Sequence, residues 1–368
     1  MQVIQQDKNF GSYKKEDCIF LLKDVSNLIK EQGNEEREKY IQNGGHYSEM
    51  IPIEYEPSKK YYDLFHQSLQ KSKKDLALYT GIMTEKIWNK HGKDTVLVSL
   101  ARAGSPIGVL AKRYIKQFYN IDIPHYSISI IRDKGIDINA IKYIINSHPN
   151  CKIQFIDGWT GKGTITNVLK EACEDLRKNH NINLDESLAV IADPSGFSSL
   201  YGTREDFLIP SACLNSIVSG LVSRTILRDD LIGPTDFHGA KFYENLIQKD
   251  LSNFYVDEIS NCFESIKEQA IETLKDWNFD EITKVGTKDV EFIRDRYNVK
   301  DINFIKPGIG EATRVLLRRV PDKILVNDLN NPNLEHILVL AKEKNVEVEV
   351  VKLNAYSCCG IIKSMKDI

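Results

Sequence analysis

Between residues 95 and 192 the chain alternates short apolar runs with longer amphipathic stretches, and this alternation constrains the fold more than any other feature. The apolar runs are too short for helices and predict buried strands, whereas the amphipathic stretches have helical spacing. Such a repeat is typical of a parallel sheet covered by helices on both faces. Strands are expected at Thr95–Leu100, Tyr126–Ile131, Ile153–Ile156 and Leu188–Ala192, and helices at Ile107–Phe118, Asp137–Asn146 and Thr164–Arg177.

The sequence as a whole divides into three parts. A helical N-terminal extension and hood is expected over residues 1–92, and the parallel-sheet core with helical elaboration over residues 93–283. A smaller pattern of strands and helices occupies residues 284–368, so the predicted fold class is α/β with a small C-terminal α/β domain. Within the core, residues 211–226 have the apolar spacing of a packed helix.

Composition excludes several classes of protein. The net charge of −3 leaves no general basic excess, so any nucleic-acid contact must come from a local patch. The chain has no apolar run of about 18 residues and no secretory signal, so neither a membrane span nor export is expected, and the predicted location is the cytoplasm. Seven scattered cysteines without a Cys-x-x-Cys pair argue against a zinc site or a disulfide framework.

Glycine, hydroxyl and charged residues crowd the positions where the predicted strands end, which is where ligands bind in an α/β sheet. The third strand runs into Asp157 and then into a glycine-rich turn that opens a helix, an arrangement that holds phosphate through backbone N–H groups and the helix dipole. The first strand runs into Arg102, Ala103 and Gly104, a turn similar to the diphosphate-binding turn of phosphoribosyltransferases. The candidate phosphate-binding residues after Asp157 are Thr160, Gly161, Lys162, Gly163 and Thr164.

The loop after Asp157 leaves three interpretations open. A Walker-type nucleoside triphosphatase needs Gly-x-x-x-x-Gly-Lys followed by Ser or Thr, whereas this loop contains Gly-Lys-Gly-Thr. A structural turn without a ligand is the second interpretation. A phosphoribosyl diphosphate loop, in which an apolar strand and an acid precede a short Thr/Gly/Lys stretch and a helix, agrees best with the residues.

Seven ordered segments between about residues 10 and 260 resemble the StiP-type phosphoribosyltransferase family. They are GSYKKEDCIFLL, HYSEM, VSLARAGSPIGVLAKR, HYSISIIRDKGID, FIDGWTGKGTI, DFLIPSACLNSIVSGLVSRTI and DFHGAKFY. That family is associated with bacterial tellurium-resistance and stress-response gene clusters, and some members carry the label cysteine protease. The resemblance implies a phosphoribosyltransferase-like sheet and an enzyme that uses phosphoribosyl diphosphate, or a related nucleotide, in a stress-response pathway.

The resemblance also implies roles for individual residues. Asp157 would bind the ribose hydroxyls, and Arg132 with Lys134 would neutralise the charge that develops on the leaving diphosphate. The loop from residue 160 to residue 164 would hold the 5-phosphate, and residues 102–104 the diphosphate. Mg²⁺ would bridge substrate oxygens rather than occupy a protein metal site. Contacts to the base are expected from His125, Asp193, Phe197 and Tyr201.

One departure from the phosphoribosyltransferase pattern keeps other functions open. Most of these enzymes place two acids in succession, but Asp157 is followed by Gly158, so the general acid or base is unassigned and hydrolysis stays open. A non-catalytic, nucleotide-sensing and RNA-binding regulator is the alternative. A third hypothesis is a cysteine protease with Cys213 as nucleophile and His238 or His125 as base. The apolar surroundings of Cys213 argue against it, because they raise the pKa of a thiol.

A Pro-Gly-x-Gly turn at residues 307–310 opens a helix that carries several arginines, which suits a nucleic-acid backbone. Residues 285–360 resemble the pelota-type RNA-binding domain, so RNA is an expected partner beside phosphoribosyl diphosphate or a nucleotide. No membrane partner is expected, and a homodimer is left open. The candidate RNA-binding residues are Lys306, Arg314, Arg318 and Arg319, although arginines on a helix also occur as a plain solvated face.

Overall fold

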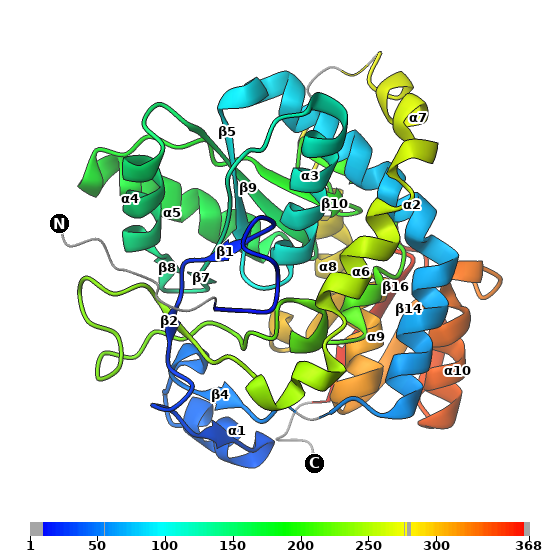
Figure 1. Ribbon diagram of the computed structural model, residues 1–368. Coiled ribbons are helices and arrows are strands. Elements are labelled where there is room, and N and C mark those ends of the chain that lie inside the picture. The colour runs from blue at the N-terminus through cyan, green and yellow to red at the C-terminus, as the bar shows by residue number, and fades with distance from the viewer. Residues whose placement is uncertain (1–9, 55, 276, 278–280, 364–368) are drawn as a thin grey trace.

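The computed structural model describes residues 10–54, 56–275, 277 and 281–363 (Figure 1). The outer ends of the predicted parts, residues 1–9 and 364–368, and residues 278–280 near their boundary lie outside the described residues. The centre of the molecule is a six-stranded sheet in the order β1-β6-β5-β9-β10-β11, and all its neighbouring strands are parallel. The strands are β1 (Ile19–Phe20), β5 (Thr95–Leu100), β6 (His125–Ile128), β9 (Lys152–Trp159), β10 (Leu188–Ala192) and β11 (Leu200–Thr203).

Helices cover both faces of this sheet, as is usual for a parallel sheet. Successive side chains of a strand point to opposite faces, so they belong to different hydrophobic cores. Leu97 and Ile156 belong to the core beneath α2 and α3, whereas Val98 and Phe155 belong to a second core beneath α4 and α5. The predicted parallel sheet between two helical layers is therefore confirmed. The covering helices are α2 (Lys59–His91), α3 (Gly104–Tyr119), α4 (Ile138–Ser147) and α5 (Thr164–His180).

The C-terminal domain is a four-stranded sheet with helices, as the sequence predicts. Its strand order is β13-β16-β14-β15; β14 and β15 are parallel, and β16 is antiparallel to both β13 and β14. Its strands are β13 (Ile305–Pro307), β14 (Pro321–Val326), β15 (Glu347–Val350) and β16 (Cys358–Ile362), and its helices are α8 (Val285–Arg296), α9 (Ile309–Arg318) and α10 (Glu335–Glu343).

The C-terminal domain shares a hydrophobic core with the rest of the molecule. α2 runs past the central sheet and on along the C-terminal helices (Figure 1), and side chains of α2, α9 and α10 belong to one buried cluster. The Tyr61 hydroxyl on α2 donates a hydrogen bond to the carbonyl of Leu317, and Lys71 Nζ donates to the carbonyl of Pro332 at 3.3 Å. The two parts therefore pack as one body.

The helix predicted over residues 211–226 is wrong. The chain there forms the short 3₁₀ turns η3 (Pro210–Ala212) and η4 (Ser216–Val218), and positive φ angles follow at Gly220 (+87°) and Leu221 (+56°). A residue in the left-handed region ends a helix. The apolar spacing reflects the burial of an irregular segment, in which Leu214, Ile217 and Val218 are all buried.

The remaining elements are short; η7 and η8 belong to the C-terminal domain, and the others precede it in the chain. None of the helices within the described residues combines the length and apolarity needed to cross a bilayer. The strands are β2 (Lys23–Asp24), β3 (Glu31–Gln32), β4 (Ile51–Pro52), β7 (Ile130–Ile131), β8 (Gly135–Ile136) and β12 (Gly239–Ala240); the α-helices are α1 (Asn34–Gln42), α6 (Ser252–Ser260) and α7 (Lys267–Glu272); the 3₁₀ turns are η1 (Tyr47–Glu49), η2 (Gly92–Asp94), η5 (Glu244–Lys249), η6 (Phe263–Ser265), η7 (Ile302–Phe304) and η8 (Pro332–Leu334).

Candidate functional site

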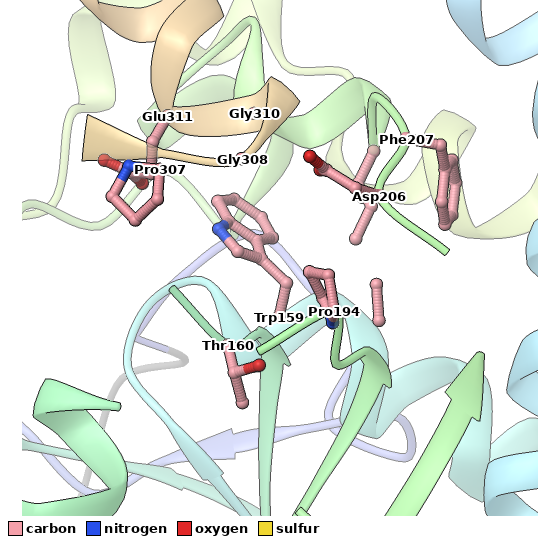
Figure 2. A pocket seen from close by; sticks show the side chains of 11 residues that line it. Trp159, Thr160, Pro194, Asp206, Phe207, Pro307, Gly308, Gly310 and Glu311 are labelled. Atoms are coloured by element: carbon pink, nitrogen blue, oxygen red, sulfur yellow. The ribbon is translucent and has the colours of Figure 1, made fainter. Parts of the chain in front are cut away.

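The C-terminal domain covers the edge at which the central strands end. Figure 2 shows the side chain of Trp159, at the end of β9, extending toward Gly308 and Gly310 at the start of α9. A narrow pocket lies between the two parts of the chain, so any ligand there would contact both. Its lining residues are Trp159, Thr160, Ala192, Pro194, Asp206, Phe207, Ile209, Pro307, Gly308, Gly310 and Glu311.

Asp157 precedes Trp159 by two residues on β9 and is close enough to Glu311, which lines the pocket, for the two charges to interact. One of its carboxylate oxygens accepts a hydrogen bond from the backbone N–H of Gly158 at 2.8 Å. Burial raises the pKa of Asp157 to about 7, and the charge of Glu311 adds to the rise while the Gly158 N–H and the charge of Arg314 oppose it. Arg314 pairs with Glu311 at 2.9 Å and lies over the Trp159 ring at 4.8 Å. Asp157 is thus poised to exchange a proton near neutral pH.

The glycine-rich loop after β9 is held by the C-terminal domain. Lys162 Nζ donates to the carbonyl of Ile302 at 2.6 Å, and the Tyr356 hydroxyl donates to the carbonyl of Gly161 at 2.9 Å. Gly163 has a φ of +76° and precedes the first residue of α5, Thr164; a Cβ at Gly163 would lie 2.2 Å from the ring of Phe197. Only glycine can occupy this close turn.

Asp193 organises the end of β10 and is fully buried. Its carboxylate accepts hydrogen bonds from the backbone N–H groups of Phe197, at 3.0 Å, and Ser198, at 2.8 Å. It also accepts from the Thr160 hydroxyl and forms an ion pair with Arg204. Asp193 and Thr160, both predicted to contact a ligand, are therefore engaged in holding two strand ends together.

Arg102 and Arg318 approach the strand-end edge from opposite parts of the chain. Arg102 Nη1 donates to the carbonyl of Val222 at 3.1 Å and lies 4.0 Å from a carboxylate oxygen of Glu54. Arg318 on α9 donates to the carbonyl of Cys213 at 2.6 Å and to the side chain of Asn215. α9 thus turns Arg318 toward the central body, so Arg318 does not lie on the plain solvated face that was one interpretation of the sequence.

The turn after Arg102 is tightly packed against β9. Ala103 precedes the first residue of α3, Gly104, and a Cβ at Gly104 would lie 2.3 Å from the carbonyl oxygen of Ile156. The predicted diphosphate turn and the Asp157 loop are therefore neighbours, as the topology of parallel strands requires.

Some of the remaining candidate residues lie at the edge where the central strands end, and others lie in the interior of the protein. Arg132 donates to the side chain of Asn303 at 3.2 Å, and Lys134 is exposed in the β7–β8 hairpin. His125 is buried, with its ring nitrogens 2.8 Å from the Ser99 hydroxyl and 2.8 Å from the carbonyl of Asp17, and burial lowers its pKa to about 4. Tyr201 lies beneath the cations of Lys86 and Arg204. His125 is thus a structural side chain of β6.

Sequence reasoning missed Asp206, which joins the two parts of the chain. It accepts hydrogen bonds from the backbone N–H groups of Ile309, at 2.9 Å, and Ser357, at 2.8 Å. Its partners lie more than 100 residues away along the chain, so no local spacing pattern reveals them.

We expect Asp206→Ala to lower the free energy of unfolding by about 2 kcal/mol, because it leaves two donors of the domain contact without a partner. Urea denaturation followed by fluorescence measures the loss. Asp328→Ala removes an exposed aspartate whose side chain accepts a hydrogen bond from the nearby Asn330 N–H, a local contact, and should change stability little. Equal stability of the two variants would contradict the role of Asp206.

The cysteine hypothesis depends on Cys213, which is fully buried. Burial raises the pKa of its thiol to about 12, so a thiolate is scarce at neutral pH. His238 contacts the Ser129 hydroxyl at 2.9 Å, and within the described part of the chain no histidine is hydrogen-bonded to a cysteine. Cys358 and Cys359, at the start of β16, are buried as well.

Comparison with known proteins supports two assignments. A family model described as tellurite-like stress resistance cysteine protease StiP matches residues 11–260, and a model described as PELOTA RNA binding domain matches residues 284–364. A curated protein named cysteine protease StiP, from Acinetobacter baylyi, is 34% identical over 354 residues, which cover 93% of this chain and 90% of that protein.

The prediction of a phosphoribosyltransferase that uses phosphoribosyl diphosphate is wrong, because both the matching family and this relative are described as cysteine proteases, that is, as hydrolases. The association with stress resistance and the match to an RNA-binding domain are supported. In the described ranges no three His, Cys, Asp or Glu side chains are placed to hold a metal. The Mg²⁺ predicted to bridge substrate oxygens needs no such group of side chains, so it stays a prediction.

Proposed function

Because the chain belongs to the StiP family of tellurite-like stress resistance proteins, we propose that it acts in a cytoplasmic stress response and binds RNA where its two parts meet. The match to an RNA-binding domain supports the ligand class. The binding surface would be a cationic edge formed by Arg132, Lys162, Lys306 and Arg319.

The gathering of these cations at one edge is the observation that carries the proposal. Lys162 donates to the carbonyl of Ile302 at 2.6 Å, and Arg132 donates to the side chain of the adjacent Asn303 at 3.2 Å. Burial, together with the charges of Lys306 and Arg132 and against the charge of Asp301, lowers the pKa of Lys162 to about 8. Burial also lowers the pKa of Lys306, with Arg319 and Arg132 adding to the effect and Glu311 and Asp301 opposing it. Cations crowded in this way are stabilised by an anion, and an RNA backbone supplies a row of them.

The proposal predicts that RNA affinity depends on pH through Lys162. With a pKa of about 8, Lys162 is mostly charged at pH 7 and mostly neutral at pH 9, so affinity should fall as the pH rises across this range. The loss should be about tenfold, which corresponds to one hydrogen bond from a charged donor. Filter binding of a structured RNA at several pH values measures it.

Lys162→Arg is the matched variant, because arginine keeps its charge throughout this range. It should bind RNA with an affinity that changes little between pH 7 and pH 9. If the RNA affinity of the unchanged protein and of Lys162→Arg depends on pH in the same way, Lys162 does not contact the RNA. If no RNA binds at pH 7, the proposal itself is wrong.

Thiol-dependent peptide hydrolysis is the second candidate function, and the name of the 34% identical relative favours it. In this chain Cys213 is buried, with a pKa raised to about 12, whereas Cys151 and Cys262 are partly exposed.

We expect iodoacetamide at pH 7 to leave Cys213 of the native protein unlabelled, because a buried, protonated thiol reacts slowly. Mass spectrometry of the digested protein measures the labelling of each cysteine. Hydrolysis of casein measures the activity of the variants Cys213→Ser, Cys262→Ser and Cys151→Ser. Loss of hydrolysis in Cys213→Ser alone, with its fold retained, would identify Cys213 as the nucleophile and contradict this expectation.

A further inference from the structure

Three arginines from distant segments gather beside the cationic edge. Arg102 follows β5, Arg318 lies on α9, and Arg224 lies two residues after Val222, whose carbonyl accepts the hydrogen bond from Arg102. Glu54 links the group. Its carboxylate lies 4.0 Å from Arg102 and accepts a hydrogen bond from the hydroxyl of Ser216. The preceding residue, Asn215, accepts a hydrogen bond from Arg318. All three arginines are half-buried.

The charges of this group do not balance. Glu54 is the carboxylate nearest to Arg102, and within the described residues no carboxylate lies within ion-pair distance of Arg224 or Arg318. Arg224 instead lies over the ring of Tyr47, at 5.2 Å. Burial first, and then neighbouring arginines, lower the pKa of both Arg224 and Arg318 to about 10. Within this group, three cations against one carboxylate leave an excess of two positive charges, and Arg37 and Arg319 lie close enough to Arg224 to add to that excess.

We propose that Arg102, Arg224 and Arg318 bind the terminal phosphate of an RNA chain, an inference that rests on the RNA binding proposed above. A phosphate monoester carries a charge of about −1.5 to −2 at neutral pH, which matches the excess. It also presents three oxygens that can accept several charge-assisted hydrogen bonds from guanidinium groups.

Charge and burial favour a chain end over an internal phosphate. A diester in the middle of an RNA carries a single negative charge and is flanked by a nucleoside on each side, so it would leave one of the two excess cations without a partner. Half-buried arginines suit a group that enters from one side only. The cationic edge next to them would then contact the following phosphates of the same chain.

The test compares short RNAs of one sequence that carry a 5′-phosphate, a 3′-phosphate or hydroxyls at both ends, each bound to the full chain at fixed salt. We expect one of the phosphorylated RNAs to bind at least tenfold more tightly than the hydroxyl-ended RNA, which also identifies the end recognised. Arg224→Gln should reduce this preference to about one. Arg228→Gln is the matched control, because Arg228 is paired with Asp230 on the surface and its variant should keep the preference.

The outcomes separate this inference from the function on which it rests. Equal binding of all three RNAs would overturn the terminal-phosphate site and leave RNA binding intact. Failure of every RNA to bind would overturn RNA binding. A free nucleoside monophosphate that competes as strongly as the phosphorylated RNA would also overturn the inference, because the ligand would then be a mononucleotide.

Discussion

Replacing Asp193 by alanine should lower the free energy of unfolding by about 3–5 kcal/mol, the cost of breaking a buried ion pair by removing one partner. The side chain of Asp193 is fully buried, and its loss would leave the N–H groups of Phe197 and Ser198 without acceptors and Arg204 without its carboxylate. Thermal and urea unfolding monitored by circular dichroism measure the change.

Asp175→Ala provides the comparison for Asp193. Asp175 is exposed on α5, and among the described residues its side chain contacts Asn179 and, more weakly, His180, so its loss should change stability by no more than about 0.5 kcal/mol. A loss below about 1 kcal/mol for Asp193→Ala would mean that the strand ends at Thr160 and Phe197 are held by other contacts.

Removing the cations of the proposed RNA surface should have the second large effect. The triple variant Lys162→Gln, Lys306→Gln and Arg319→Gln should bind RNA about a thousandfold more weakly, since each charged hydrogen bond contributes about 1.5 kcal/mol. The dependence of log affinity on log salt concentration should become shallower by about 2, because each phosphate contact with a single strand contributes roughly 0.7 to that slope. Titrations at several salt concentrations measure both.

The control for this triple variant is a second one with the same change of net charge. Lys170, Arg177 and Lys178 are exposed on α5, away from the cationic edge. Replacing all three by glutamine should leave both the affinity and the salt slope nearly unchanged. If the two triple variants lose affinity equally, RNA binding depends on overall charge and not on the proposed surface.

The sequence predicted the central sheet well because its signal is local. Runs such as Thr95–Leu100 are mostly apolar and too short for a helix, which favours a strand buried on both faces, and every residue of this run is buried. Residues 211–226 were misjudged for the opposite reason: their apolar spacing resembles a helix, but the backbone turns at Gly220 and Leu221 and is buried without regular structure. The spacing of apolar residues indicates which side chains are buried, and side chains of irregular segments are buried as well as those of helices and strands.

The candidate site was predictable only in part. The approach of the Arg102 turn to β9 follows from parallel topology, so the sequence could place it beside Asp157. The contacts of Arg318 with Cys213 and of Asp206 with Ile309 join segments about 100 residues apart, and no spacing pattern encodes them. Likewise, the sequence could show that Asp193 and Thr160 lie at strand ends, but not that they bind each other.

The hydrophobic cluster that runs from α2 into α9 and α10 has a consequence for the life of the protein in the cell. A chain cut between the two parts would expose apolar side chains on both fragments, so neither piece would persist as an independent module.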